Sequence, residues 1–147
     1  MPSNIHASAV VLGERGVLIT GASGLGKTGL ALALVAHARS FGLFGRFVGD
    51  DQLFLEAHGG RLLCLAPPTI AGYAEIRGLG PSPVDFERKA PVDLLVRLER
   101  EGKADRFPET TTELLCGCQI RLLTLAGGDR DGALFAIASC LSLPPFG

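Results

Sequence analysis

The sequence predicts an α/β fold, a single P-loop domain built on a mixed β-sheet, and three observations support this prediction. The chain has 147 residues, a length that suits one domain around one core. Hydrophobic residues make up 47% of it and charged residues 20%, which favours a compact globular chain. Strand-like and helix-like apolar runs alternate around a glycine-rich motif. Residues 1–147 are therefore expected to form one domain.

The first elements are expected to be a hairpin followed by a helix. Residues 10–12 and 17–20 are rich in β-branched side chains, and a turn-like segment, residues 13–16, separates them. Apolar residues then recur at helical spacing over residues 27–40, and Gly42 supplies a stop signal just beyond. The order strand, glycine-rich loop, helix follows.

A second group of strands is expected next. Residues 47–49 form a short apolar run that ends in Asp50 and Asp51, so this acidic pair is predicted at the end of a strand. Residues 53–56 and 61–65 flank a Gly-Gly pair and predict another hairpin.

The remaining segments complete the expected domain. Residues 67–91 are rich in proline and glycine and show little periodicity, which predicts mostly exposed loop. Residues 92–99 alternate between apolar and polar with one exception, as in a half-buried strand. Residues 120–125 predict one more strand, and residues 134–141 carry an apolar face at helical spacing. The chain is thus expected to close with a helix.

Composition excludes several classes of protein. The net charge of −1 lacks the basic excess typical of nucleic-acid-binding proteins. The longest apolar run, residues 30–36, is too short to span a bilayer, and the first twenty residues lack an export signal. We therefore expect a cytoplasmic protein with no membrane or nucleic-acid partner. Its cysteines are expected to be reduced thiols, and the C-x-C pair lacks the second pair of a zinc site: Cys64, Cys116, Cys118, Cys140.

The strongest motif is a phosphate-binding loop of the pattern G-x-x-x-x-G-K-[ST]. It consists of Gly21, Ala22, Ser23, Gly24, Leu25, Gly26, Lys27 and Thr28. Its glycines allow backbone N–H groups to face phosphates, and the following helix presents the positive end of its dipole. Lys27 is expected to reach the β- and γ-phosphates and the Thr28 hydroxyl to bind Mg²⁺. The predicted ligands are ATP and Mg²⁺, and the alternative is a glycine-rich turn without a ligand.

The acidic pair is the second candidate. P-loop proteins keep a metal-ordering carboxylate at a strand end, which suits Asp50, and a neighbouring carboxylate such as Asp51 could accept the proton of an attacking hydroxyl. The alternative is a turn or a helix cap, where aspartate is also common.

Further along, residues 74–80, Ala-Glu-Ile-Arg-Gly-Leu-Gly, resemble the signature of the HPr kinase/phosphorylase family, whose core is E-[IV]-R-G-L-G. His6 lies ten residues before Gly16, as the family's active-site histidine precedes its glycine. Asp50-Asp51 is similar to the family's paired aspartates, and Arg106 resembles its loop arginine. The resemblance covers residues 6–139.

The resemblance implies a protein serine kinase that uses ATP and Mg²⁺ to phosphorylate HPr or a nitrogen-branch HPr-like phosphocarrier protein, and it leaves reverse phosphorolysis open. It also implies a nucleotide-binding core resembling that of phosphoenolpyruvate carboxykinase and a homo-oligomer, which is a hexamer in the family. Asp51 would be the general base, with His6 beside it. Glu75 would join Asp50 and Thr28 in holding metal, and Arg77 and Arg106 would stabilise the phosphate charge.

Other interpretations of these residues stay open. His6 could be an ordinary surface histidine, Glu75 and Arg77 could form only a salt bridge, and the basic residues from 97 to 106 could be a solvated face. Two rival functions are a small-molecule P-loop kinase and a catalytically inactive ATP-binding regulatory module. The chain begins just before His6, so we expect the short form of the family, with the catalytic domain only.

Overall fold

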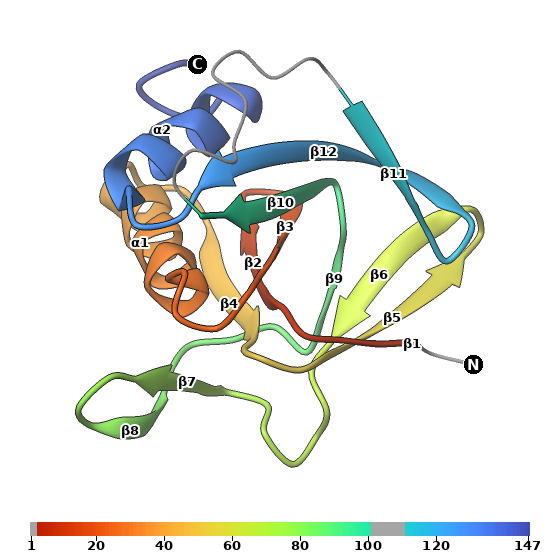
Figure 1. Cartoon of the computed structure of the whole chain (residues 1–147), viewed down its shortest axis with the longest axis horizontal. Coiled ribbons are helices and arrows are strands. Elements are labelled where there is room, and N and C mark those ends of the chain that lie inside the picture. The colour runs from red at the N-terminus through yellow and green to blue at the C-terminus, as the bar shows by residue number, and fades with distance from the viewer. Residues whose placement is uncertain (1–2, 101–110) are drawn as a thin grey trace.

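The computed structural model describes residues 3–100 and 111–147, which form layered sheets and helices (Figure 1). The strands are β1 (Ser3–Ile5), β2 (Ser8–Leu12), β3 (Arg15–Gly21), β4 (Gly45–Gly49), β5 (Leu53–His58), β6 (Arg61–Leu65), β7 (Tyr73–Ile76), β8 (Gly80–Pro83), β9 (Lys89–Pro91), β10 (Leu94–Glu99), β11 (Thr111–Leu115) and β12 (Cys118–Ala126). The helices are α1 (Lys27–Ser40) and α2 (Arg130–Cys140). In the part of the chain so described, neither helix is long and apolar enough to cross a membrane.

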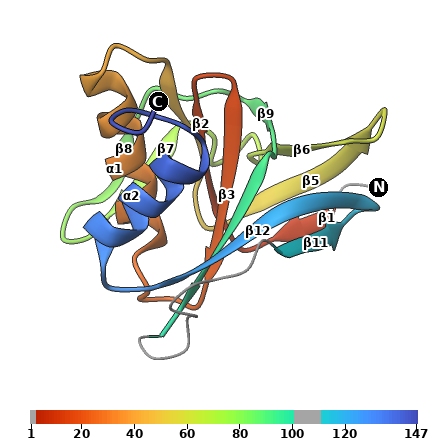
Figure 2. The same ribbon diagram turned by 90° about the horizontal axis from the view of Figure 1, so that it is seen from above.

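The central element is a mixed six-stranded sheet with the order β11-β12-β10-β3-β2-β4. Strands β3, β10 and β12 run parallel, whereas β2 pairs antiparallel with both β3 and β4. Helices α1 and α2 cover one face of this sheet, and a four-stranded sheet, β1-β5-β6-β9, lies on the other side (Figure 2). The predicted mixed α/β architecture is confirmed.

Alternation along β2 and β3 produces two apolar cores. Val10 and Ile19 face the helices and pack against buried residues of α1 such as Leu34. Val11 and Leu18 point to the opposite face and pack against the four-stranded sheet. Because successive strand residues point to opposite faces, both sides of this hairpin are apolar and buried. The predicted hairpin, α1, the strand before Asp50, the β5–β6 hairpin, β12 and the closing helix are all present.

Strand β10 is present, and its predicted alternation largely holds. Leu94, Val96 and Leu98 are buried in one core, whereas Arg97 and Glu99 are partly exposed. The exception to the pattern, Leu95, is buried in the other core, because β10 lies between the parallel strands β3 and β12, where both faces are covered. Arg97 donates to both carboxylate oxygens of Glu113 on β11, at 2.6 and 2.7 Å.

The expectation of mostly exposed loop over residues 67–91 is only partly correct, because few residues there are buried but three strands lie in the segment. The segment contains the β7–β8 hairpin and the short strand β9, which joins the four-stranded sheet. Gly78 and Gly80 in the hairpin have φ of +86° and +100°, so the glycines that suggested a loop instead allow a tight turn. The signature-like residues 74–80 therefore form a strand and its turn. The short strands β1 and β11 were also not predicted.

Candidate active site

The phosphate loop connects β3 to α1, as predicted. Gly24 and Gly26 have φ of +86° and +90°, a region that side chains with a Cβ rarely adopt. Gly26 is also the N-cap of α1, and in this fully described helix no side chain caps the N-terminus and the first turn contains no acidic residue. The backbone N–H groups and the positive end of the helix dipole are thus directed at the loop, an arrangement suited to an anion.

Lys27 and Thr28 extend from the first turn of α1 in two directions. The Lys27 ammonium folds back over the loop and donates to the carbonyl oxygen of Gly21 at 2.8 Å and to that of Ala22 at 3.4 Å. The Thr28 hydroxyl donates instead to the Asp50 carboxylate, with Oγ1 2.8 Å from Oδ1 and 3.0 Å from Oδ2. A hydroxyl and a carboxylate in this relation are the protein groups that hold Mg²⁺ in P-loop proteins, so these residues fit that ion.

Asp50 is contacted by several of the elements that form the site. It follows β4 and accepts hydrogen bonds from three elements: from Thr28 on α1, from Ser8 Oγ on β2 at 2.6 Å, and from the backbone N–H of Glu75 on β7 at 3.0 Å. Three donors fix the orientation of the carboxylate. Asp50 therefore also anchors the signature-like hairpin to the phosphate loop.

Asp51 has a different environment. Its φ is +64°, and the N–H of Gln52 donates to the Asp50 carbonyl at 2.7 Å, which together describe a γ-turn of the rare, strained kind. Strained backbone of this sort concentrates at functional sites. The carboxylate of Asp51 is exposed and lines the same cleft as the phosphate loop. His6 lies beside it as predicted, but its Nδ1 contacts the Asp51 carbonyl oxygen, at 3.2 Å.

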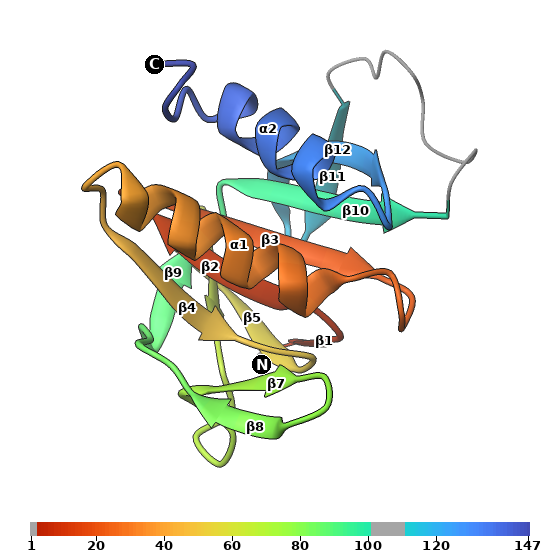
Figure 3. The ribbon, with the colours of Figure 1, turned by 90° about the vertical axis from the view of Figure 1, so that its left-hand side faces the viewer.

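The cleft has a volume of about 1190 Å³ and runs between the phosphate loop, the acidic pair and the β7–β8 hairpin, which lies below α1 in Figure 3. Among its lining residues are Lys27, Thr28, Asp50, Asp51, Glu75 and Arg77. Together with Ser23, Gly24 and Gly26 of the phosphate loop, nine of the predicted site residues therefore share one cavity, although they come from distant parts of the sequence. His6 does not line the cleft, and Arg106 lies outside the residues that the structure describes.

Glu75 and Arg77 are both exposed in this cleft, and no ion pair joins them within the described ranges. The alternative that they form only a salt bridge with each other finds no support. In residues 3–100 and 111–147 there is no group of three His, Cys, Asp or Glu side chains that could hold a metal ion. Mg²⁺ is commonly held by one or two carboxylates together with substrate phosphates and water, so Asp50 with Thr28 can suffice.

Two residues of the site were not predicted. Ser8 is fully buried, and its hydroxyl donates to Asp50 across 42 positions of sequence. The available signal was a serine inside an otherwise apolar strand. Arg130, at the start of α2, lines the cleft opposite the hairpin. In the sequence it lies shortly before residues 134–141, the segment expected to form the closing helix.

Comparison with known proteins agrees with this geometry. Residues 2–125 match the family model described as the HPr serine kinase C-terminal domain. The chain belongs to this family. The predicted resemblance to the family is thereby confirmed, and the matched range contains the phosphate loop, the acidic pair and the signature-like hairpin.

Relatives in the family are moderately similar in sequence. The chain is 35% identical over 137 residues to an HPr kinase/phosphorylase of Bordetella petrii, an alignment that covers 84% of this chain and 42% of the relative. It is 31% identical over 100 residues to the corresponding protein of Mycoplasma mycoides, covering 63% and 30%. The chain thus spans less than half the length of these curated relatives.

The fold is shared with a solved member of the family. The structure of the Hpr(Ser) kinase/phosphatase from Coxiella burnetii matches with a TM-score of 0.79 and 25% sequence identity, covering 95% of this chain and 93% of that chain. The mixed sheet and its helices are therefore those of an HPr kinase structure.

Proposed function

We propose that this chain is a single catalytic domain that binds ATP and Mg²⁺ and transfers the γ-phosphoryl group to a seryl hydroxyl of HPr or of a nitrogen-branch HPr-like phosphocarrier protein. The observation that carries the proposal is the contact between the Thr28 hydroxyl and the Asp50 carboxylate beside Lys27. These groups are arranged as a nucleotide and its metal ion require. Membership of the family supports the choice of a phosphocarrier as substrate.

In the proposed reaction the phosphate loop holds the triphosphate. Lys27 would contact the β- and γ-phosphates in place of the two carbonyl oxygens, and Thr28 and Asp50 would hold Mg²⁺, which would neutralise charge on the transferring group. The exposed Asp51 carboxylate accepts the proton of the seryl hydroxyl as its oxygen attacks the γ-phosphorus and the bond to the β-phosphate oxygen breaks. With inorganic phosphate as acceptor, a phosphate oxygen attacks the phosphorus of phosphoserine, the bond from the serine oxygen to phosphorus breaks, and pyrophosphate forms. The Asp51 carboxylic acid then returns the proton to the serine oxygen.

The remaining predicted residues have supporting roles. Glu75 would approach the metal from the hairpin, and Arg77 and Arg106 would stabilise negative charge on the transferring phosphoryl group. His6 would hold the strained backbone of Asp51 through the carbonyl contact. The likeness of the core to phosphoenolpyruvate carboxykinase, the cytoplasmic location and the homo-oligomer remain parts of this proposal.

The test is phosphate transfer. Purified protein is incubated with ATP, Mg²⁺ and HPr from the same organism, and the carrier is examined by mass spectrometry for one added phosphate on serine. Asp51→Asn should lower kcat by about 10² to 10⁴, the usual contribution of a general base, while ATP affinity is retained. Glu14→Gln is the matched control, because Glu14 is exposed at the β2–β3 turn, at the opposite end of β3 from the phosphate loop.

The outcomes separate the rival functions. Phosphoserine on the carrier that depends on Asp51 supports the protein kinase. ATP binding without transfer to any carrier would favour the inactive regulatory module, and transfer only to a small molecule would favour the small-molecule kinase. Loss of ATP binding in Asp51→Asn would make Asp51 a metal ligand and refute its role as base.

A further inference from the structure

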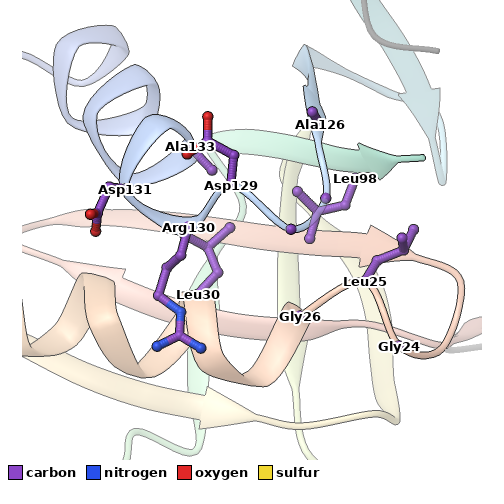
Figure 4. Close-up of a pocket in the computed structure, with 12 residues that line it drawn as sticks. Gly24, Leu25, Gly26, Leu30, Leu98, Ala126, Asp129, Arg130, Asp131 and Ala133 are labelled. Carbon is purple, nitrogen blue, oxygen red and sulfur yellow. The ribbon is translucent and has the colours of Figure 1, made fainter. Parts of the chain in front are cut away.

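A second cavity lies on the other side of the phosphate loop from the acidic cleft (Figure 4). It has a volume of about 440 Å³, which is of the size of a ligand site. The walls are Gly24, Leu25, Gly26, Leu30, Leu98, Ala126, Gly127, Gly128, Asp129, Arg130, Asp131 and Ala133. One wall is therefore the phosphate loop itself, and the facing wall is the turn from β12 into α2.

The position of this cavity follows from the strand order. Strands β3, β10 and β12 are parallel neighbours, so their carboxyl ends meet at one edge of the sheet (Figure 3). Ligands of open α/β sheets bind outside such an edge. Asp50 and Asp51 follow β4, on one side of β3, whereas the cavity borders the ends of β10 and β12, on the other side. A triphosphate with its terminal phosphate near Asp51 would point its other end toward this cavity.

The cavity walls are fixed by close packing. A Cβ on Gly127 would lie 2.9 Å from Cδ2 and 3.1 Å from Cβ of Leu25, so the turn rests directly on the phosphate loop. The N–H of Gly127 donates to the Glu99 carbonyl at the end of β10, at 2.6 Å. Asp129 caps α2 by accepting from the Gly132 N–H at 3.0 Å. The turn is thus held from three sides.

The chemistry of the walls suits a base and a sugar. Leucine and alanine side chains line one part of the cavity and provide apolar contact for the faces of a ring, and Asp129, Arg130 and Asp131 add charged groups on the α2 side. Gly128 has a φ of +88° and open space where a Cβ would be, so a ligand can approach the polar backbone closely there. Apolar walls with a few polar backbone groups are typical of small-molecule sites.

Arg130 connects this cavity with the acidic cleft, because it lines both. Its side chain extends from α2 toward α1 (Figure 4), and a Cβ on Gly29 would lie 2.5 Å from its Nη2. Gly29 is in the first turn of α1, where the phosphates are expected. Within the described residues no carboxylate forms an ion pair with Arg130, and arginine is suited to bidentate phosphate contact.

We propose that the cavity between the phosphate loop and the β12–α2 turn holds the base and ribose of the nucleotide, and that Arg130 binds its phosphates from the α2 side. This inference rests on the proposed function, since it requires a triphosphate in the loop. It assigns a nucleoside subsite and one further phosphate-binding residue to the chain.

The test compares two ligands, MgATP and inorganic tripolyphosphate with Mg²⁺, by calorimetry. Gly128→Asn places a side chain that tolerates the left-handed region at the cavity, and it should weaken ATP binding about tenfold or more while tripolyphosphate affinity changes less than about twofold. Arg130→Met should weaken both ligands. Gly60→Asn is the matched control, because Gly60 has a φ of +78° and open space in the β5–β6 turn, and it should alter neither affinity.

A second measurement locates the base directly. Photolysis with 8-azido-ATP should label peptides from the β12–α2 turn, and labelling confined to the β7–β8 hairpin would place the base in the acidic cleft and overturn the subsite. Unchanged ATP affinity in Gly128→Asn, or equal weakening of both ligands, would overturn it as well. If wild-type protein binds neither ligand, the proposed function itself fails, whereas ATP binding that depends on Lys27 but not on Gly128 removes only the subsite.

Discussion

Replacing Ser8 by alanine tests whether the buried serine positions Asp50. The Ser8 hydroxyl is fully buried and donates to Oδ1 of Asp50 at 2.6 Å, a length typical of a charge-assisted hydrogen bond. A hydrogen bond to a charged group contributes about 1.5 to 3 kcal/mol. Because Asp50 is only half-buried and keeps its donors from Thr28 and Glu75, water can replace part of the loss. We expect the lower end, a loss of about 1.5 kcal/mol in the free energy of unfolding.

The assay is thermal unfolding without nucleotide. For a domain of this size, 1 kcal/mol lowers Tm by about 2 to 4 °C, so Ser8→Ala should lower it by roughly 3 to 6 °C. Ser139→Ala is the control, because Ser139 is exposed on α2, and it should stay within about 0.5 kcal/mol of wild type. A double-mutant cycle with Asp50→Ala then isolates the pair and should give a coupling of about 1 kcal/mol or more. Equal Tm in wild type and Ser8→Ala, or additive effects in the cycle, would refute the reasoning.

Three further predictions follow from the same contacts. MgATP at a hundredfold excess over Kd should stabilise the wild-type protein by about 2.7 kcal/mol and so raise its Tm. Lys27→Met should remove this rise. A rise that persists in the variant in a thermal shift assay would exclude the loop as the phosphate site. Gly16→Ala should lower the free energy of unfolding in urea by more than about 4 kcal/mol, because its Cβ would fall on the backbone carbonyl of Pro91 in β9. Gly13→Ala should lower it by only about 1 to 2 kcal/mol, because Gly13 has open space and a φ of +64°. Similar losses in the two variants would contradict this prediction. Cys116, a free exposed thiol, should react with iodoacetamide in native protein at pH 8. Cys64 should react only after unfolding, because burial raises the pKa of its thiol to about 12 and the thiolate is the nucleophile. Alkylation of Cys64 in native protein, found by peptide mapping, would disprove its burial.

The sequence predicted the parts of the fold that depend on local signals. The phosphate loop, α1 and the β2–β3 hairpin are contiguous patterns, and each was predicted close to its observed bounds. Strand β10 was predicted as a strand, but the burial of Leu95 on its second face was not, because it depends on the neighbours in the sheet. The β7–β8 hairpin was taken for loop, since glycine and proline signal both turns and loops.

The candidate site likewise contains residues that sequence motifs predict and residues that only the fold brings together. Motif and resemblance named the residues that line the cleft, but the contact between Ser8 and Asp50 joins β2 to the end of β4, and no spacing rule connects positions so far apart. Arg130 was missed for the same reason, because only the packing of α2 beside α1 brings it near the phosphate loop. Residues that position the reacting groups are thus the ones that required the structure.

The adjacent aspartates illustrate how the fold can give two neighbouring carboxylates different tasks. Asp50 already accepts hydrogen bonds from Ser8, Thr28 and the Glu75 N–H, so its carboxylate is held in place beside the Thr28 hydroxyl. The strained turn at Asp51 lies just beyond the end of β4 and leaves the Asp51 carboxylate exposed in the cleft. A carboxylate exposed in the cleft is within reach of a substrate hydroxyl. This contrast supports the proposal that Asp50 serves the metal ion while Asp51 serves the hydroxyl, and it explains why substitution of each should affect a different step.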